Sequence, residues 1–170
     1  MNQKNGKPAS TVALGGVLAA LAVVIMSLGG LIPVATYVSP MLCALLLQMV
    51  LVSCGARIAW AWYGAVAILA VLLSPDKEAA AVFVFLGYYP IIKPKLDKLP
   101  LRALWKGLLF NASVAVMYYL LLRLFGMEAL NQEFSEMGVG VLVILLLMGN
   151  VTFYLLDRLL GMEKLKKRFL

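Results

Sequence analysis

Residues 93–106 read KPKLDKLPLRALWK and form the longest polar interruption in an otherwise apolar chain. The stretch contains five basic side chains and one acidic side chain, Asp97. Pro94 and Pro100 argue against one uninterrupted helix, because proline lacks the amide hydrogen that a helix interior needs. Short loops rich in lysine and arginine stay on the cytoplasmic side of a membrane. We therefore expect this loop in the cytoplasm, and its position gives a direction to each apolar segment on either side.

The amino-acid composition is typical of a membrane protein. Of the 170 residues, 64% are hydrophobic and 14% are charged, whereas a soluble domain is about half apolar and about a quarter charged. The net charge of +7 comes mainly from basic residues at the ends of apolar segments, where the positive-inside rule accounts for them. The sequence thus predicts contact with membrane lipid and no binding of nucleic acid.

The apolar runs predict an all-α integral membrane protein in which six transmembrane helices form one compact domain over residues 1–170. A helix needs about 20 residues to cross the hydrocarbon layer. Pro40 is expected to begin the second helix, Gly87 and Pro90 interrupt the fourth, and Ser74 or Asp76 is expected to cap the start of the fourth. The predicted spans are residues 11–32, 40–54, 58–74, 78–92, 103–125 and 138–160.

The basic residues predict that both termini are cytoplasmic. With six spans in this orientation, thirteen of the fifteen lysines and arginines lie inside. Only Lys77 and Arg123 lie at the outer side, where most of the acidic residues gather. The inverted orientation would place the thirteen cations outside, against the positive-inside rule. We expect a multi-pass protein of a cell membrane, most simply the plasma membrane of a bacterium.

Polar side chains within the apolar runs form two predicted groups. One group lies at similar depth in the inner half of the membrane and is either a layer of interhelical hydrogen bonds or a polar lining for a ligand; it comprises Gln48, Tyr88, Tyr89, Asn111 and Asn150. The other lies near the outer surface and is either a set of solvated loop charges or the rim of a small-solute site; it comprises Tyr37, Asp76, Lys77, Glu78, Arg123 and Glu128.

Residue types that carry chemistry are scarce. Histidine is absent, and the two cysteines, Cys43 and Cys54, lie in one apolar run without a C-x-x-C pattern. We expect both thiols to be free and to pack as small hydrophobic groups, with no metal site and no cofactor. Neither a carboxylate pair nor a base beside a nucleophile is visible, so no catalytic residue is assigned and an enzyme is not expected.

The first predicted span carries small residues at helical spacing. They fall on two neighbouring stripes of the helix, so one side of it is nearly flat backbone, which permits close approach of another helix. This face either packs against a neighbouring span or docks a separate subunit. The residues that define it are Ala13, Gly15, Gly16, Ala19 and Ala20.

This pattern resembles the substrate-binding S components of energy-coupling factor (ECF) vitamin transporters. The resemblance covers most of the chain: a short basic start, the first helix ALGGVLAALAVVIMSLGG, six spans, both ends inside and a basic tail. In that family an A-x-x-x-A type surface on the first helix meets the T component, and Gly15-x-x-x-Ala19 and Gly16-x-x-x-Ala20 are the nearest matches here. The resemblance implies capture of a small water-soluble compound, with a T-type transmembrane subunit and a pair of ATPases as partners.

Two other functions stay open on the sequence. One is a small membrane scaffold or regulatory subunit of another membrane complex, which needs only the flat face of the first span and the basic inner loops. The other is a lipid-handling enzyme, for which residues 74–78 are the one candidate cluster. The chain has no G-x-x-x-x-G-K-[ST] motif, so any use of ATP would depend on a partner.

Overall fold

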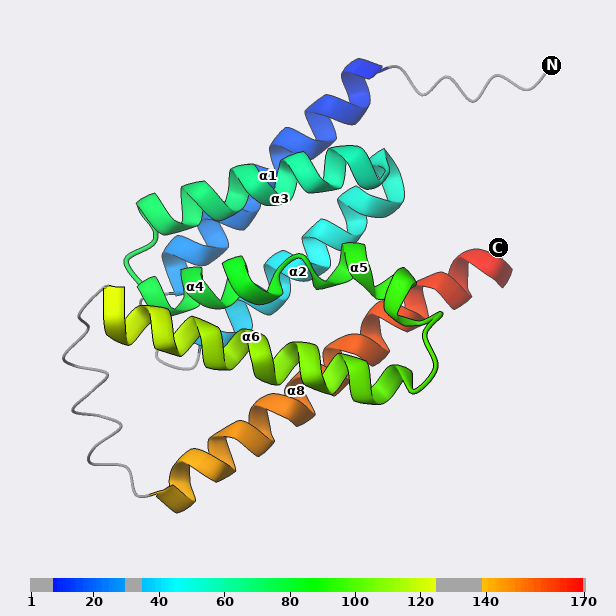
Figure 1. The fold of residues 1–170 in the computed structure, drawn as a ribbon. Coiled ribbons are helices and arrows are strands. Elements are labelled where there is room, and N and C mark those ends of the chain that lie inside the picture. The colour runs from blue at the N-terminus through cyan, green and yellow to red at the C-terminus, as the bar shows by residue number, and fades with distance from the viewer. Residues whose placement is uncertain (1–7, 30–34, 125–138, 170) are drawn as a thin grey trace. The chain divides into compact units, whose positions relative to one another are not determined.

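The computed structural model describes residues 8–29, 35–124 and 139–169, and within these ranges the chain is helical and contains no strand (Figure 1). This confirms the prediction of an all-α chain. The helices are α1 (Pro8–Gly29), α2 (Ala35–Cys54), α3 (Ala56–Leu73), α4 (Lys77–Leu86), α5 (Tyr89–Leu96), α6 (Arg102–Leu124) and α8 (Val139–Phe169).

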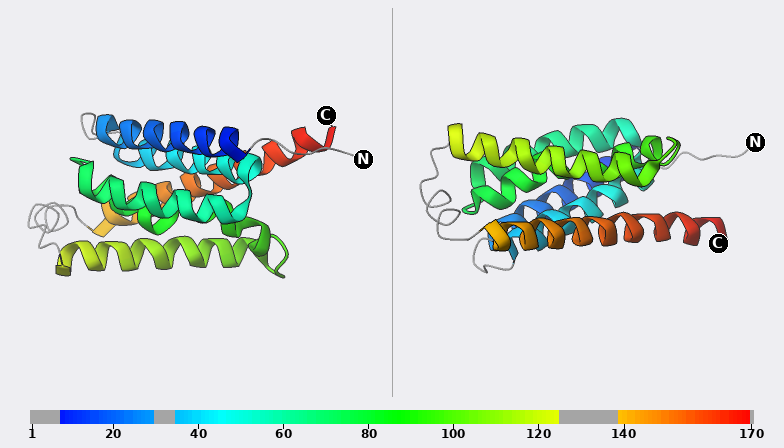
Figure 2. Two further views of the ribbon diagram at one scale, coloured as in Figure 1. Left: turned by 90° about the horizontal axis from the view of Figure 1, so that it is seen from above. Right: turned by 60° about the horizontal axis from the view of Figure 1, so that its bottom comes forward.

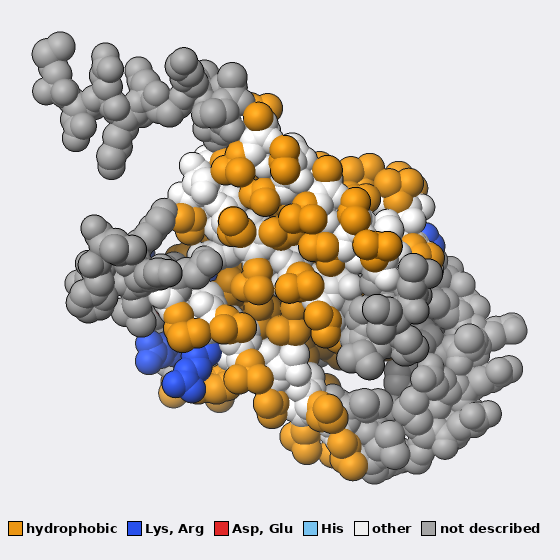
Figure 3. Space-filling model, turned by 180° about the vertical axis from the view of Figure 1, so that it is seen from behind, with side chains coloured by type: hydrophobic (Ala, Val, Ile, Leu, Met, Phe, Trp, Pro, Cys, Tyr) orange, Lys and Arg blue, Asp and Glu red, His pale blue; other side chains and the backbone are white. Residues whose placement is uncertain are grey.

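Four helical segments of the described chain are long and apolar enough to cross a membrane. A shorter apolar stretch, Val12–Leu28, lies within α1. Hydrophobic side chains dominate the described surface seen in Figure 3, and the visible lysines and arginines lie toward its edges. This pattern is typical of a multi-pass membrane protein. The four segments are Thr36–Cys54, Ala56–Leu73, Lys77–Leu96 and Arg102–Leu121.

The chain divides into two compact units, residues 1–95 and residues 96–170. In the first unit α2 is central and contacts α1, α3 and α4, and α1 also contacts α3 (Figures 1 and 2). The core of this unit combines small residues that bring helix backbones close with larger side chains that fill the remaining space. Its fully buried members include Ala22, Met26, Leu47, Val66 and Phe83.

The helix α2 begins earlier than the sequence predicts. It runs from Ala35 to Cys54, with Pro40 inside the helix and not at its start. Because Pro40 lies near the N-terminal end, its missing amide hydrogen affects only the carbonyl of Thr36, in the first turn. The helix therefore has 20 residues and spans about 30 Å at 1.5 Å per residue. The predicted start of the second span at residue 40 is therefore wrong, because the helix begins at Ala35.

The fourth predicted span consists of two helices, α4 and α5, separated at Gly87 and Tyr88. Pro90 and Pro94 remove two amide donors just after this break. The hydroxyl of Tyr63 on α3 donates to the carbonyl of Val84, one of the last residues of α4. The break predicted at Gly87 is confirmed, and α3 supports it from the side.

Gly87 is expected to be intolerant of substitution. A Cβ atom there would meet the carbonyl oxygen of Phe83 and lie 2.6 Å from Cδ2 of the Phe83 ring, whereas a Cβ at Gly64 in α3 would meet nothing within 4 Å. We predict that Gly87→Ala lowers the free energy of unfolding by about 1–3 kcal/mol, as overpacking typically does. Gly64→Ala is the control and should be neutral or slightly stabilising. Thermal unfolding of both variants in detergent is the measurement, and equal midpoints would contradict the prediction.

The helices of the second unit, α6 and α8, are antiparallel neighbours. α6 begins one residue earlier than predicted, and α8 extends to Phe169, nine residues beyond the predicted end of the last span at residue 160. The extension has a simple physical cause. Hydropathy reports where a helix leaves the hydrocarbon layer, and the basic residues that follow have good helical propensity in water.

Candidate functional site

An open groove of about 290 Å³ lies on the first unit between α1 and α3. Gly15 and Gly16 contribute no side chain to it, and a Cβ at either position would meet nothing within 4 Å. Two of the surrounding apolar side chains, Val12 and Ile58, are 69% and 38% exposed. The groove is lined by Val12, Gly15, Gly16 and Ala19 of α1 and by Ile58, Ala61 and Trp62 of α3.

Trp62 fixes the relative position of the two helices that form the groove. Its side chain is 5% exposed, and its indole N–H donates to the carbonyl oxygen of Gly15 at 2.9 Å. This hydrogen bond satisfies the one polar group of a large side chain in an apolar setting. The base of the groove is therefore set by a side-chain hydrogen bond from α3 to the backbone of α1, in addition to apolar packing.

The small residues of α1 have different surroundings toward the two ends of the helix. Gly15, Gly16 and Ala19 line the open groove. Ala22, which continues the same stripe, is fully buried in the core of the unit, and its carbonyl oxygen lies 3.5 Å from Sγ of Cys43. Ala13 and Ala20 are exposed and do not line the groove. The stripe thus packs internally toward its C-terminal end and is open toward its N-terminal end.

A hydrogen-bonded cluster forms where the α3–α4 turn meets the start of α2. Oδ2 of Asp76 accepts from the Thr36 hydroxyl at 2.7 Å, and Oδ1 accepts from the amide of Ala79 at 2.9 Å, which confirms Asp76 as the cap of α4. The Tyr37 hydroxyl donates to Oε1 of Glu78 at 2.9 Å. These bonds tie the start of α2 to the start of α4.

The same turn also holds the ends of α1 and α3. The ammonium group of Lys77 donates to the carbonyl oxygens of Val71 and Ser74 at 2.8 and 2.9 Å, and so closes the C-terminal end of α3. The hydroxyl of Ser74 is 3.1 Å from the carbonyl oxygen of Met26 on α1. The turn therefore joins all four helices at one end of the unit.

Of the six predicted rim residues, the structure brings together Tyr37, Asp76, Lys77 and Glu78. Arg123 is exposed near the end of α6 in the second unit, and Glu128 lies outside the described residues. The sequence correctly places four of the side chains near one another. Tyr37 bonds to Glu78, whereas Asp76 caps α4 and Lys77 bonds to carbonyl oxygens at the end of α3. Their use in binding a solute stays a prediction.

The predicted inner polar layer is represented by one amide pair and several separate residues. Asn111 on α6 and Asn150 on α8 bond reciprocally, Nδ2 to Oδ1, at 3.0 and 3.2 Å. In the first unit Tyr88 stacks on Trp60 with ring centroids 6.3 Å apart, and Tyr89 is buried. Gln48 is 2% exposed, and its Nε2 has no hydrogen-bond partner. A continuous layer through all five residues stays a prediction.

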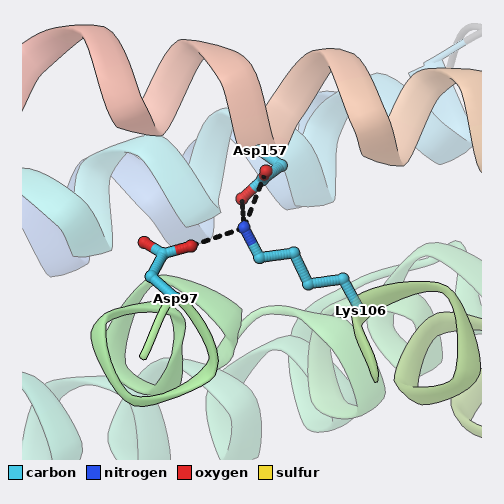
Figure 4. Close-up of polar contacts among 3 residues, drawn as sticks. All are labelled: Asp97, Lys106 and Asp157. Carbon is cyan, nitrogen blue, oxygen red and sulfur yellow. Dashed lines mark hydrogen bonds and ion pairs between the residues drawn. The ribbon is translucent and has the colours of Figure 1, made fainter. Parts of the chain in front are cut away.

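An ion cluster in the second unit was missed by the sequence analysis. Nζ of Lys106 on α6 lies 2.6 Å from Oδ1 of Asp97, and 3.0 and 2.9 Å from the two carboxylate oxygens of Asp157 on α8 (Figure 4). The exposed fractions of the Lys106, Asp97 and Asp157 side chains are 12%, 33% and 19%. A signal did exist, because Asp157 is the one acidic residue in the last predicted span and Lys106 lies in the first turns of the facing helix.

The cluster is one of three successive contacts between α6 and α8. Next to it, Phe110 stacks on Phe153 with centroids 4.9 Å apart. Gly149 allows this approach, because a Cβ there would lie 3.2 Å from Cζ of Phe110. The Asn111–Asn150 amide pair follows. An ion pair, an aromatic stack and an amide pair therefore fix the register of the two helices.

The described residues contain no group of three or more histidine, cysteine, aspartate or glutamate side chains placed to hold a metal ion. Because small residues of α1 line it, the groove between α1 and α3 is a candidate surface for another helix. The hydrogen-bonded cluster around Asp76 is a candidate rim for a small solute. The sequence matches no protein-family model, and comparison with curated proteins and with solved structures finds no match.

Proposed function

We propose that this chain is a membrane-embedded substrate-capture subunit that resembles the S components of ECF transporters. In this proposal it takes up a small water-soluble micronutrient and docks on a T-type transmembrane subunit, which is coupled to a pair of ATPases. The observation that carries the proposal is the open groove on α1 lined by Gly15, Gly16 and Ala19. Small residues let helix backbones approach closely, which is how helices associate where lipid removes the hydrophobic driving force.

The proposed topology has six crossings with both termini in the cytoplasm of a bacterial plasma membrane. α1, α2, α3, α6 and α8 each make one crossing, and α4 with α5 makes another, as segment Lys77–Leu96. An even number of crossings places both termini on one side. The basic residues of segment 93–106, which joins α5 to α6, then select the cytoplasmic side for that end.

The proposed solute site is at the outer side, around the start of α4. The Tyr37–Glu78 hydrogen bond is exposed, so a polar solute could exchange for it without leaving a buried group unpaired. The Thr36–Asp76 bond is partly buried, and Asp76 is also the cap of α4. We therefore propose that Asp76 positions the start of α4 and does not itself contact the solute. The parts of Arg123 and Glu128 in such a rim stay predictions from the sequence alone.

A thermal-shift screen of vitamins and their precursors on the purified full chain tests the proposal. A ligand that binds only the folded state stabilises it by about 2.7 kcal/mol at one hundred times its dissociation constant, which raises the unfolding midpoint by several degrees. We expect at least one compound to do so, and Tyr37→Phe to reduce the shift because it removes the hydroxyl. A full screen without any stabilising compound would contradict solute capture.

A second candidate function is a membrane scaffold or regulatory subunit of another complex. It is favoured by the hydrogen bonds from Thr36 to Asp76, from Tyr37 to Glu78 and from Lys77 to the end of α3, because these bonds give the side chains a structural use. A scaffold requires only the groove on α1. Recovery of an unrelated membrane protein in fixed stoichiometry, together with an empty ligand screen, would favour this alternative.

A further inference from the structure

Leu101 combines two features that local stability does not explain. Its backbone is left-handed, with φ 55, a conformation suited to glycine or asparagine. It also precedes the first residue of α6, and its carbonyl oxygen accepts from the amides of Leu104 and Trp105 at 2.9 and 3.2 Å. Residues at such a cap position are usually serine, threonine, aspartate, asparagine or glycine. Leucine suits neither the left-handed backbone nor the cap position. Its side chain is also 75% exposed, so burial within the protein does not explain it either.

The residues around Leu101 share its exposure and divide into two chemical types. Leu99, Leu104 and Trp105 are 42%, 62% and 45% exposed. Lys98 and Arg102 are also exposed and carry positive charge. We call residues 98–105 the basic–apolar segment. It presents large apolar side chains interleaved with cations, which a loop in bulk water would not favour.

The depth of the segment follows from the helix after it. α6 has 23 residues and is about 34 Å long at 1.5 Å per residue, which exceeds the hydrocarbon thickness of about 30 Å. With α6 as a membrane span, we expect its charged first residue, Arg102, and the turn before it at the level of the lipid headgroups. Tryptophan is enriched at that level, and arginine and lysine extend their charged ends toward phosphate groups.

We infer that the basic–apolar segment is a binding site for anionic phospholipid in the bordering leaflet. Leu99, Leu101 and Leu104 enter the boundary between headgroups and acyl chains, and Lys98 and Arg102 contact the lipid phosphates. Basic residues beside a membrane helix attract anionic lipids, and apolar side chains inserted beside them strengthen such binding. This contact accounts for an exposed leucine at a strained backbone position. The inference requires only that α6 spans the membrane and is independent of solute capture.

Native mass spectrometry of the full chain released from vesicles tests the site. The vesicles contain equal amounts of phosphatidylglycerol and phosphatidylcholine, and the retained lipids are counted. We expect wild type to retain phosphatidylglycerol in excess, and Arg102→Gln to reduce that excess several-fold. Arg57→Gln is the matched control, because Arg57 is exposed at the start of α3 and lies outside the segment. Equal effects of the two variants would show general charge attraction and overturn the inference.

Leu101→Asn separates the lipid contact from local stability. Asparagine suits both the left-handed backbone and the cap position, so we expect a higher unfolding midpoint in detergent together with fewer retained lipids. A higher midpoint with unchanged lipid retention would overturn the inference. A second outcome would also overturn the inference: the wild-type chain shows no lipid preference and instead binds a protein, and Leu101→Asn releases that protein. The basic–apolar segment would then be covered by a protein surface and not by lipid.

Discussion

Ala19→Leu is expected to reduce recovery of the proposed T-type subunit and the proposed ATPase pair at least tenfold when the complex is purified through this chain. Ala19 lines the groove between α1 and α3, and a leucine there would project into the space that an incoming helix must occupy. Close approach of helix backbones, which small residues allow, is one of the interactions that drive association of membrane helices. A tenfold loss corresponds to about 1.4 kcal/mol, which is modest for a large side chain placed in a helix contact.

Ala20→Leu provides the matched control. It makes the same chemical change one residue along the same helix, at an exposed position outside the groove. The sequence alone assigns both alanines to one docking face, whereas the structure separates them. We expect Ala20→Leu to retain the partners and to keep the wild-type unfolding midpoint, since exposed substitutions usually change stability by less than about 0.5 kcal/mol. Ala19 is half-buried against the core of the unit, so the midpoint of Ala19→Leu is measured as well, to show that the fold is retained. Loss of partners with Ala20→Leu alone would show that the docking face is elsewhere on α1.

Hydropathy predicted the helices well but not their ends. An apolar run records contact with lipid or core, and such contact requires helical backbone in a membrane, so the spans follow directly. At the start of α2 the backbone is already helical before Pro40. At the end of α8 the backbone stays helical to Phe169, where the side chains have become polar. Hydropathy measures the preference of side chains for lipid and does not report whether the backbone is helical in either case.

Contacts near a turn were predictable, and contacts between distant helices were not. Asp76, Lys77 and Glu78 are consecutive, so their proximity and the cap on α4 follow from local spacing. For Gln48 and Asn111, depth in the membrane could be estimated from nearby charges, but depth does not tell which way a side chain faces around its helix. The structure places Asn111 opposite Asn150 and leaves Nε2 of Gln48 unpaired.

Lys106→Ala is expected to destabilise the second unit by about 2–3 kcal/mol. The change leaves the carboxylates of Asp97 and Asp157 facing each other without the cation that both contact. Removing one member of a fully buried ion pair costs about 3–5 kcal/mol, and the expected loss is smaller here because the Asp97 side chain is 33% exposed. The unfolding midpoint in detergent is the measurement, and Arg102→Ala, at an exposed position four residues earlier on α6, should leave it unchanged.

The pair Lys106 and Asp157 also predicts how a double substitution behaves. Asp157→Leu alone leaves the ammonium group with Asp97 only and should be destabilising, whereas Lys106→Met with Asp157→Leu replaces both charges by apolar side chains. Because well-packed apolar residues often substitute for a buried ion pair without loss, we expect the double variant to recover much of the stability that either single variant loses. Additive losses in the double variant would contradict direct coupling between α6 and α8 through this pair. The Phe110–Phe153 stack and the Asn111–Asn150 pair would then hold the register without it.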